Sequence, residues 1–114
     1  MLAYEKLDGW KVCHELAVAT YRATEHRIAE DEDDVIARLR HCALRAAGRL
    51  AFGAGSGDQR MLRSAVLHTL SWLSEFAYVL ELAKSWALLS PANCANLDAL
   101  RGRGAFYTAR LLDP

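Results

Sequence analysis

Apolar residues recur along this chain at the 3.6-residue spacing of an α-helix, and this periodicity limits the fold more than any other feature. The apolar–polar alternation that is typical of strands is rare. Only two prolines and seven glycines occur in 114 residues, which argues against collagenous, low-complexity and turn-rich all-β chains. Apolar residues make up 53% of the chain, enough for one core. We therefore expect an all-α fold in a single domain, residues 1–114.

Four segments have the helical periodicity, and we expect helices over residues 9–28, 34–52, 58–89 and 91–112. Asp8 and Asp58 are suitable N-caps, and Ser90 followed by Pro91 is a strong start signal. Because the connecting loops are short, we predict an antiparallel up-down-up-down four-helix bundle. Gly102 and Gly104 weaken the last helix by about 1 kcal/mol each relative to alanine. Either the helix bends there or a neighbour packs against the bare backbone.

The first two helices have one apolar stripe each. In the first stripe we interpret His14 as a core histidine. The carboxylates of residues 30–34 favour the positive end of the second helix dipole. The run Gly53-Ala54-Gly55-Ser56-Gly57 follows a helix and precedes no lysine, so we expect a loop with a glycine C-cap rather than a phosphate loop. The second stripe is formed by Ile36, Leu39, Ala43, Ala46, Ala47 and Leu50.

The third helix has apolar residues on two sides, so we expect it to be buried on two sides. In a four-helix domain the second side is expected to meet another subunit, since a large exposed apolar patch would favour aggregation. We predict that this oligomer interface is formed by Leu67, Leu70, Tyr78 and Leu88.

The net charge is zero, but the charges are unevenly distributed. Residues 1–37 have a net charge of −5 and residues 38–63 a net charge of +5. Arg38, Arg45 and Arg49 lie on one side of the second helix, opposite its apolar stripe, and arginine forks suit phosphate oxygens. Two interpretations stay open. These arginines bind nucleic acid, or they are solvated or pair with the acidic residues 30–34 of a neighbouring subunit.

No residue pattern predicts a catalytic site, a metal site or a cofactor. His41 and His68 have no metal-ligating residue at helical i+3 or i+4 spacing, and no Glu-x-x-His pair occurs. Glu75 is interpreted as a structural contact to Arg40. Three cysteines without a pairing pattern predict reduced thiols in a cytoplasmic protein. No signal peptide or membrane span is predicted, and we expect no membrane partner and no small-molecule substrate.

Three spaced motifs suggest a family. They are Tyr4-x-x-Leu7-x-x-Trp10-x-x-x-x-Glu15-Leu16-Ala17-x-x-x-Tyr21-x-x-Thr24, then Leu39-Arg40-x-x-Ala43 continuing into Leu50-Ala51-Phe52-Gly53-x-Gly55, then Glu75-Phe76-x-x-x-Leu80-x-x-Ala83. With them the chain resembles the bacterial four-helix-bundle proteins encoded in intervening sequences of 23S rRNA genes. That family is similar to the accessory variability proteins of diversity-generating retroelements.

The resemblance implies a non-enzymatic protein that assembles into a ring, a homopentamer in known relatives. For the retroelement accessory proteins it also implies a positively charged surface that binds nucleic acid and a reverse transcriptase. The family's Asn-Ile-Ala-Glu-Gly segment reads Arg49-Leu50-Ala51-Phe52-Gly53 here, so polar residues of the relatives are replaced. We therefore expect an oligomeric interaction or scaffold protein. The alternative is a nucleic-acid-binding accessory protein that uses Arg38, Arg45 and Arg49.

Overall fold

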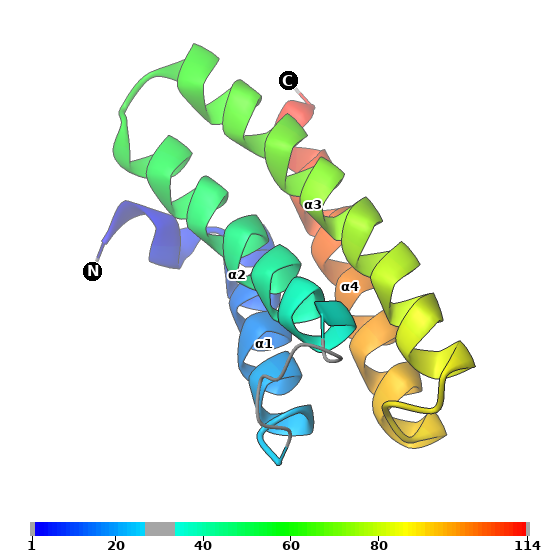
Figure 1. Cartoon of the computed structure of the whole chain (residues 1–114). Coiled ribbons are helices and arrows are strands. Elements are labelled where there is room, and N and C mark those ends of the chain that lie inside the picture. The colour runs from blue at the N-terminus through cyan, green and yellow to red at the C-terminus, as the bar shows by residue number, and fades with distance from the viewer. Residues whose placement is uncertain (1, 27–33, 114) are drawn as a thin grey trace.

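The computed structural model describes residues 2–26 and 34–113 and confirms the all-α bundle (Figure 1). Its helices are α1 (Asp8–Ala23), α2 (Asp34–Gly55), α3 (Gln59–Ser85) and α4 (Pro91–Ala109). Short 3₁₀ helices precede and follow them, η1 (Ala3–Lys6) and η3 (Arg110–Leu112). The molecule measures 41 × 22 × 22 Å, so the helices lie along one long axis.

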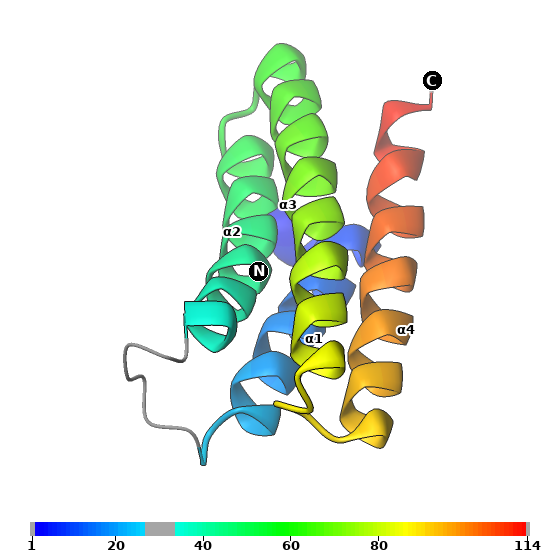
Figure 2. The ribbon, with the colours of Figure 1, turned by 45° about the vertical axis from the view of Figure 1, so that its right-hand side comes forward.

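Each helix packs against two others. α1 and α3 both contact α2 and α4, and the most extensive packing is between α2 and α3. Successive helices run in opposite directions along the bundle, as the colours of Figure 2 show. Short loops favour this arrangement because they connect only neighbouring, antiparallel helices.

The core contains the predicted stripe of α2 in full. Every one of its six residues is buried, and Cys42 lies beside them. Phe76 of α3 is the largest side chain that is fully buried. Four buried threonines complete the core. Thr69 ties α3 to α2, because its hydroxyl donates to the Ala46 carbonyl at 2.9 Å.

The predicted starts of α3 and α4 are confirmed. The Asp58 carboxylate accepts from the Arg60 amide at 2.8 Å, and the Ser90 hydroxyl accepts from the Asn93 amide at 3.1 Å. Each cap satisfies one of the amides that have no partner in the first turn of a helix. α1 starts differently, since Asp8 is its first residue and the N-cap is Leu7.

The sequence predicts an apolar stripe on α1 at Trp10, Cys13, His14, Ala17, Tyr21, Thr24 and Ile28, and the structure confirms it only in part, since Cys13, Ala17 and Thr24 are buried. Val12, Leu16 and Thr20 are buried, whereas His14 is exposed and its ring stacks on Trp10 with centroids 4.9 Å apart. The interpretation of His14 as a core histidine is therefore wrong. Thr20 is tolerated in the core because its hydroxyl donates to the Leu16 carbonyl at 2.7 Å.

Two helix ends also differ from the predictions. α1 ends at Ala23, and residues 27–33, which include most of the acidic run, lie outside the described residues. α2 continues through Gly53 to Gly55, because Gly53 lies in the tight contact with α3 and is not a C-cap. The turn that follows uses Gly57, whose φ of 70° suits glycine.

α3 is four residues shorter than predicted and ends at Ser85. The Leu88 amide donates to the Ala83 carbonyl at 2.8 Å, and the Ala87 amide donates to the Lys84 carbonyl at 3.0 Å. This is a Schellman motif, with Ala87 at φ 55° in the position that glycine usually takes. Leu88 is therefore outside α3 and packs, half-buried, against the core.

α4 is continuous through both of its glycines. A Cβ atom on Gly104 would lie 3.3 Å from the Cys13 sulfur, so this glycine allows α1 and α4 to approach closely. A Cβ atom on Gly102 would meet nothing within 4 Å, because Gly102 is on the outer side of the helix. The helix therefore packs against a neighbour at one of the two glycines and continues unbroken through both.

Candidate interaction surfaces

Arg38, Arg45 and Arg49 form the arginine face of α2, and α3 provides the surroundings of all three. Arg38 Nη1 donates to Glu75 Oε2 at 3.3 Å, an ion pair between exposed side chains. The Cys42 thiol donates to the same carboxylate oxygen at 3.3 Å. Glu75 therefore neutralises one of the three arginines.

Glu75 makes a structural polar contact as predicted, but its partners are Arg38 and Cys42, and Arg40 has partners elsewhere. Its guanidinium donates to the Thr24 hydroxyl at 2.8 Å and to the Thr24 carbonyl at 2.6 Å. It also lies over the Tyr21 ring, 5.5 Å from the centroid. Arg40 thus fastens the start of α2 to the end of α1. Residue spacing within one helix does not reveal this contact, because Arg40 lies on α2 and Thr24 lies at the end of α1.

Arg45 and Arg49 differ from Arg38 in their contacts. The Arg45 guanidinium lies 5.9 Å from the centroid of the Trp72 ring, and the His41 ring meets the same indole edge-on at 5.3 Å. The buried Arg49 Nε has no hydrogen-bond partner. Within residues 2–26 and 34–113, no ion pair is formed by Arg45 or Arg49. Their positive charges stay available to an acceptor from outside the chain.

Apolar and basic side chains gather beside Arg49. Phe52 is 59% exposed although it is aromatic. A shallow hollow of about 90 Å³ lies next to it, lined by Arg49, Phe52, Met61, Ser64, Ala65 and His68. The sequence alone does not predict this hollow, because its lining comes from both sides of the α2–α3 turn.

The four predicted interface residues do not lie together on one surface. Leu67 is 51% exposed and Tyr78 is 66% exposed, both on the side of α3 that faces away from the bundle. Leu70 is half-buried on α3 and packs against the core, as Leu88 does beyond the helix. Leu67 and Tyr78 are therefore the two with most of their side chain free for a partner.

The outer face of α3 has an unusual composition. Between Arg63 and Glu81 the only charged residue is Glu75, and Arg38 pairs with it. We define the outer face of α3 by its exposed residues Ser64, Leu67, Ser71, Ser74 and Tyr78. A helix face of this length without a charge is unusual on a solvent-exposed surface.

An open groove of about 580 Å³ with a mixed polar and apolar lining lies between α1 and α4 and is not predicted from the sequence. Its polar lining consists of His14, Glu15, Arg22, His26, Asn93 and Asn96. These residues come from helices far apart in the sequence, so their spacing contains no signal for the groove. The groove is open to solvent along its length.

The three cysteines are free thiols and are buried. Burial raises the pKa of the Cys13 thiol to about 11. Burial, with the nearby Glu75 carboxylate as a second cause, raises the pKa of the Cys42 thiol to about 12. Both thiols are therefore protonated and unreactive at neutral pH. Among the described residues, no group of three or more His, Cys, Asp or Glu side chains could hold a metal ion.

In the part of the chain that the structure describes, none of the helices has the length and apolar character needed to cross a membrane. No family model matches the chain. A comparison with curated proteins finds no significant match.

Proposed function

We propose that this protein is a non-enzymatic, cytoplasmic interaction protein that assembles with copies of itself into a ring. The outer face of α3 is the observation that supports this assembly. The resemblance to the intervening-sequence family adds the expected number of subunits, which is five, and the scaffold role. A ring would present the same surface several times to a partner.

The composition and the exposure of the outer face of α3 both support assembly. A helix on a solvent-facing surface normally has charged residues on its outer side. Here Leu67 and Tyr78 are more than half exposed, and on the outer face of α3 only Ser71 and Ser74 lie between them. Burying a side chain of this size contributes about 1.5–3 kcal/mol. Repeated at every contact of a ring, such burial stabilises an assembly.

The test is the mass of the purified protein in solution. Multi-angle light scattering is expected to give a multiple of the 12.7 kDa chain mass at micromolar concentration. A Leu67→Lys/Tyr78→Lys variant is expected to be folded and of lower mass, since it places charges on the contact surface. Leu44→Lys, an exposed leucine of α2, is the matched control. A wild-type protein that is monomeric under these conditions would refute the proposal.

A second candidate function is binding of nucleic acid by the arginine face of α2, and one observation favours it. Neither Arg45 nor Arg49 has a carboxylate partner in the described chain, and both lie beside the aromatic residues Trp72 and Phe52. Cations that bind phosphates next to rings that stack on bases are the usual combination in single-strand binding. Ring assembly would repeat the surface and increase its avidity.

Salt-titrated binding to a single-stranded RNA tests this candidate. Because binding to phosphates releases counterions, the affinity is expected to fall steeply as salt rises. An Arg45→Glu/Arg49→Glu variant is expected to lose binding. The control is Lys11→Glu/Arg22→Glu, which makes the same change of net charge on α1. Equal losses in the two variants, or binding that is insensitive to salt, would contradict a role for the arginine face.

A further inference from the structure

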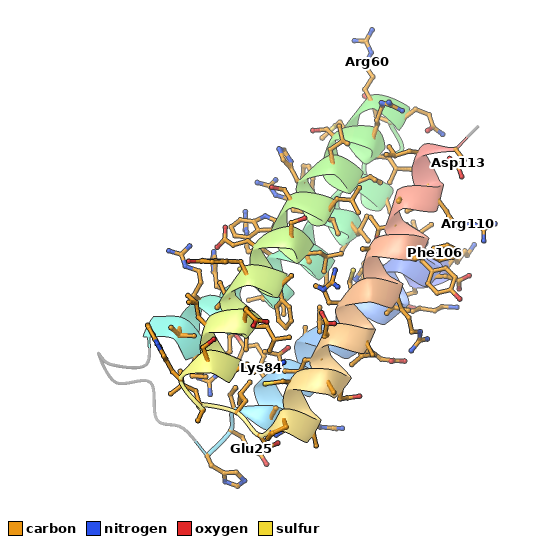
Figure 3. All side chains as sticks on the ribbon, turned by 90° about the vertical axis from the view of Figure 1, so that its right-hand side faces the viewer. Glu25, Arg60, Lys84, Phe106, Arg110 and Asp113 are labelled. Carbon is orange, nitrogen blue, oxygen red and sulfur yellow. The ribbon has the colours of Figure 1, made fainter. Side chains whose placement is uncertain are left out.

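The outer side of α4 has a regular pattern that the bundle itself does not use. The residues of this outer face are Ala95, Ala99, Gly102, Phe106 and Ala109. They follow one another at intervals of four and three residues, the spacing of a seam along which another helix packs. Phe106 is 58% exposed and projects away from the bundle, as Figure 3 shows. All other members of the face are alanine or glycine.

The outer face of α3 has the same kind of pattern. From Ser64 to Tyr78 its five residues follow at intervals of three and four. Leu67 and Tyr78 are large, and the three other residues are serines. The α3 face thus has two large side chains separated by small ones, and the α4 face has one large side chain among small ones. Two such faces fit together when each large side chain of one helix meets a small residue of the other.

Within one chain, the packing of α4 against α3 indicates which residues of the two helices lie at similar heights along the bundle axis. Gly104 lies near the height of Leu73, since a Cβ atom on Gly104 would lie 3.8 Å from Leu73 Cδ1. The two helices are antiparallel and have the same rise per residue. Because side chains lean toward the N-terminus of their own helix, counting from this pair places Phe106 within about one helical turn of Ser71 and Ala99 within about one turn of Tyr78.

These heights also apply between neighbouring copies of a ring. In a closed ring the next copy is reached by rotation alone, with no shift along the axis. When that axis is parallel to the bundle, α3 of one copy and α4 of the next meet with the heights that they have within a chain. Phe106 then packs over Ser71 of the neighbour, and Tyr78 packs over Ala99. Both contacts place a large side chain on a small one.

The charges beside the two faces are complementary. Glu75 lies on the α2 side of α3, where it contacts Arg38 and Cys42. Arg103 lies on the α1 side of α4, two helical turns beyond Asn96, which lines the α1–α4 groove. When the outer face of α3 in one copy meets the outer face of α4 in the next copy, the α2 side of the first helix and the α1 side of the second are adjacent. By the same count of heights, Glu75 lies within about one helical turn of Arg103.

We propose that the outer face of α3 in one copy binds the outer face of α4 in the next copy, and that this contact closes the ring. The inference rests on the proposed ring assembly and identifies its two contact surfaces. The contact is heterologous, because two different surfaces of the same chain meet. A heterologous contact generates a ring when the rotation closes, whereas a contact of one face with itself stops at a dimer.

Two variants, each with one face blocked, provide the test. Ser71→Arg places a long charged side chain on the α3 face, and Ala99→Arg does the same on the α4 face. Both positions are exposed, so each chain is expected to keep the helical circular dichroism of the wild type. Sedimentation is expected to show a ring for the wild type and a 12.7 kDa monomer for each variant alone. Glu15→Arg on α1 is the control and is expected to form the ring.

The mixture of the two variants is the decisive sample. One chain has a free α4 face and the other a free α3 face, so equal amounts are expected to form a complex of two chains and nothing larger. A mixture that remains monomeric would overturn the inference. So would variants that keep the mass of the wild-type ring, and in that case the proposed ring assembly itself would stand. A monomeric wild-type protein would instead refute the ring assembly.

Discussion

A Cβ atom on Gly53 of α2 would collide with the Cβ atom of Ala65 in α3. The bare backbone of one helix thus lies directly against a methyl group of the other. Farther along the same pair, the Thr69 hydroxyl donates to the Ala46 carbonyl. These contacts hold α2 and α3 close together, and the arginine face of α2 and the outer face of α3 are built on this pair of helices.

Gly53→Ala is therefore expected to destabilise the protein. The added methyl group must push α2 and α3 apart, and overpacking of this kind costs about 1–3 kcal/mol. The higher helix propensity of alanine offsets about 1 kcal/mol of that loss. Urea denaturation followed by circular dichroism measures the change in the free energy of unfolding.

Gly48→Ala is the matched control within α2. A Cβ atom on Gly48 would meet nothing within 4 Å, so the substitution adds helix propensity without a collision. It is expected to stabilise the protein by about 0.5–1 kcal/mol. If Gly53→Ala were as stable as Gly48→Ala, α2 and α3 would not be in the close contact described above.

Ala87→Gly is expected to stabilise the protein. Ala87 has φ 55° in the Schellman motif that ends α3, and a left-handed conformation costs an L-residue about 1 kcal/mol or more. Glycine has no such penalty there, so the expected gain is about 0.5–1 kcal/mol. Thermal unfolding checks it. An Ala→Gly change inside a helix, such as Ala105→Gly, is expected to destabilise the protein. If Ala87→Gly also destabilised it, Ala87 would not be strained.

The parts of the fold that follow from local chemistry were predictable from the sequence. The predicted apolar stripe of α2 is confirmed, because six apolar residues at helical spacing form one side of the helix, and that side is buried. Asp58 and Ser90 are correct because a capping side chain needs only the amides of its own first turn. Neither kind of signal depends on where the other helices lie.

The errors concern contacts between helices. Gly53 has the sequence context of a C-cap, and only the position of Ala65 explains why the helix continues past it. The sequence suggests Arg40 as the partner of Glu75, but the packing of α2 against α3 places Glu75 beside Arg38. Thr20 is buried instead of His14 because its hydroxyl finds a carbonyl in its own helix.

The candidate surfaces were predictable in part. The arginine face follows from the helical spacing of three residues, but the neutralisation of Arg38 depends on a side chain from α3. The outer face of α4 was missed, although its spacing can be read from the sequence. Four of its five residues are alanine or glycine, which contribute little to an apolar pattern, and only their exposure in the structure distinguishes them from core residues.

Alkaline pH is expected to destabilise the protein. Burial raises the pKa of Cys13 from 9.0 to about 11 and that of Cys42 from 9.0 to about 12. Between these limits the unfolded chain releases thiol protons that the folded chain retains. The free energy of unfolding therefore falls as pH rises above about 9, by at most about 1.4 kcal/mol per pH unit for each thiol. Urea titrations in reducing buffer at a series of pH values measure the slope.

Cys42→Ser is the control for this pH dependence. Serine keeps a donor for the Glu75 carboxylate but does not ionise in this range. The variant is expected to have a shallower loss of stability between about pH 9 and pH 11 than the wild type, because one of the two thiols is removed. An unchanged slope would show that Cys42 does not contribute to it.

Because Arg38 forms an ion pair with Glu75, we expect it to contribute less to RNA binding than Arg45, although both arginines lie on one helix face. If the arginine face binds single-stranded RNA, Arg45→Gln is expected to reduce the slope of log affinity against log salt by about 0.7, the value for one lost phosphate contact. Arg38→Gln is expected to leave the slope almost unchanged, because Glu75 already neutralises that guanidinium at 3.3 Å. Fluorescence anisotropy over a range of salt concentrations measures both slopes. Equal reductions would mean that Arg38 leaves Glu75 and binds phosphate when RNA is present.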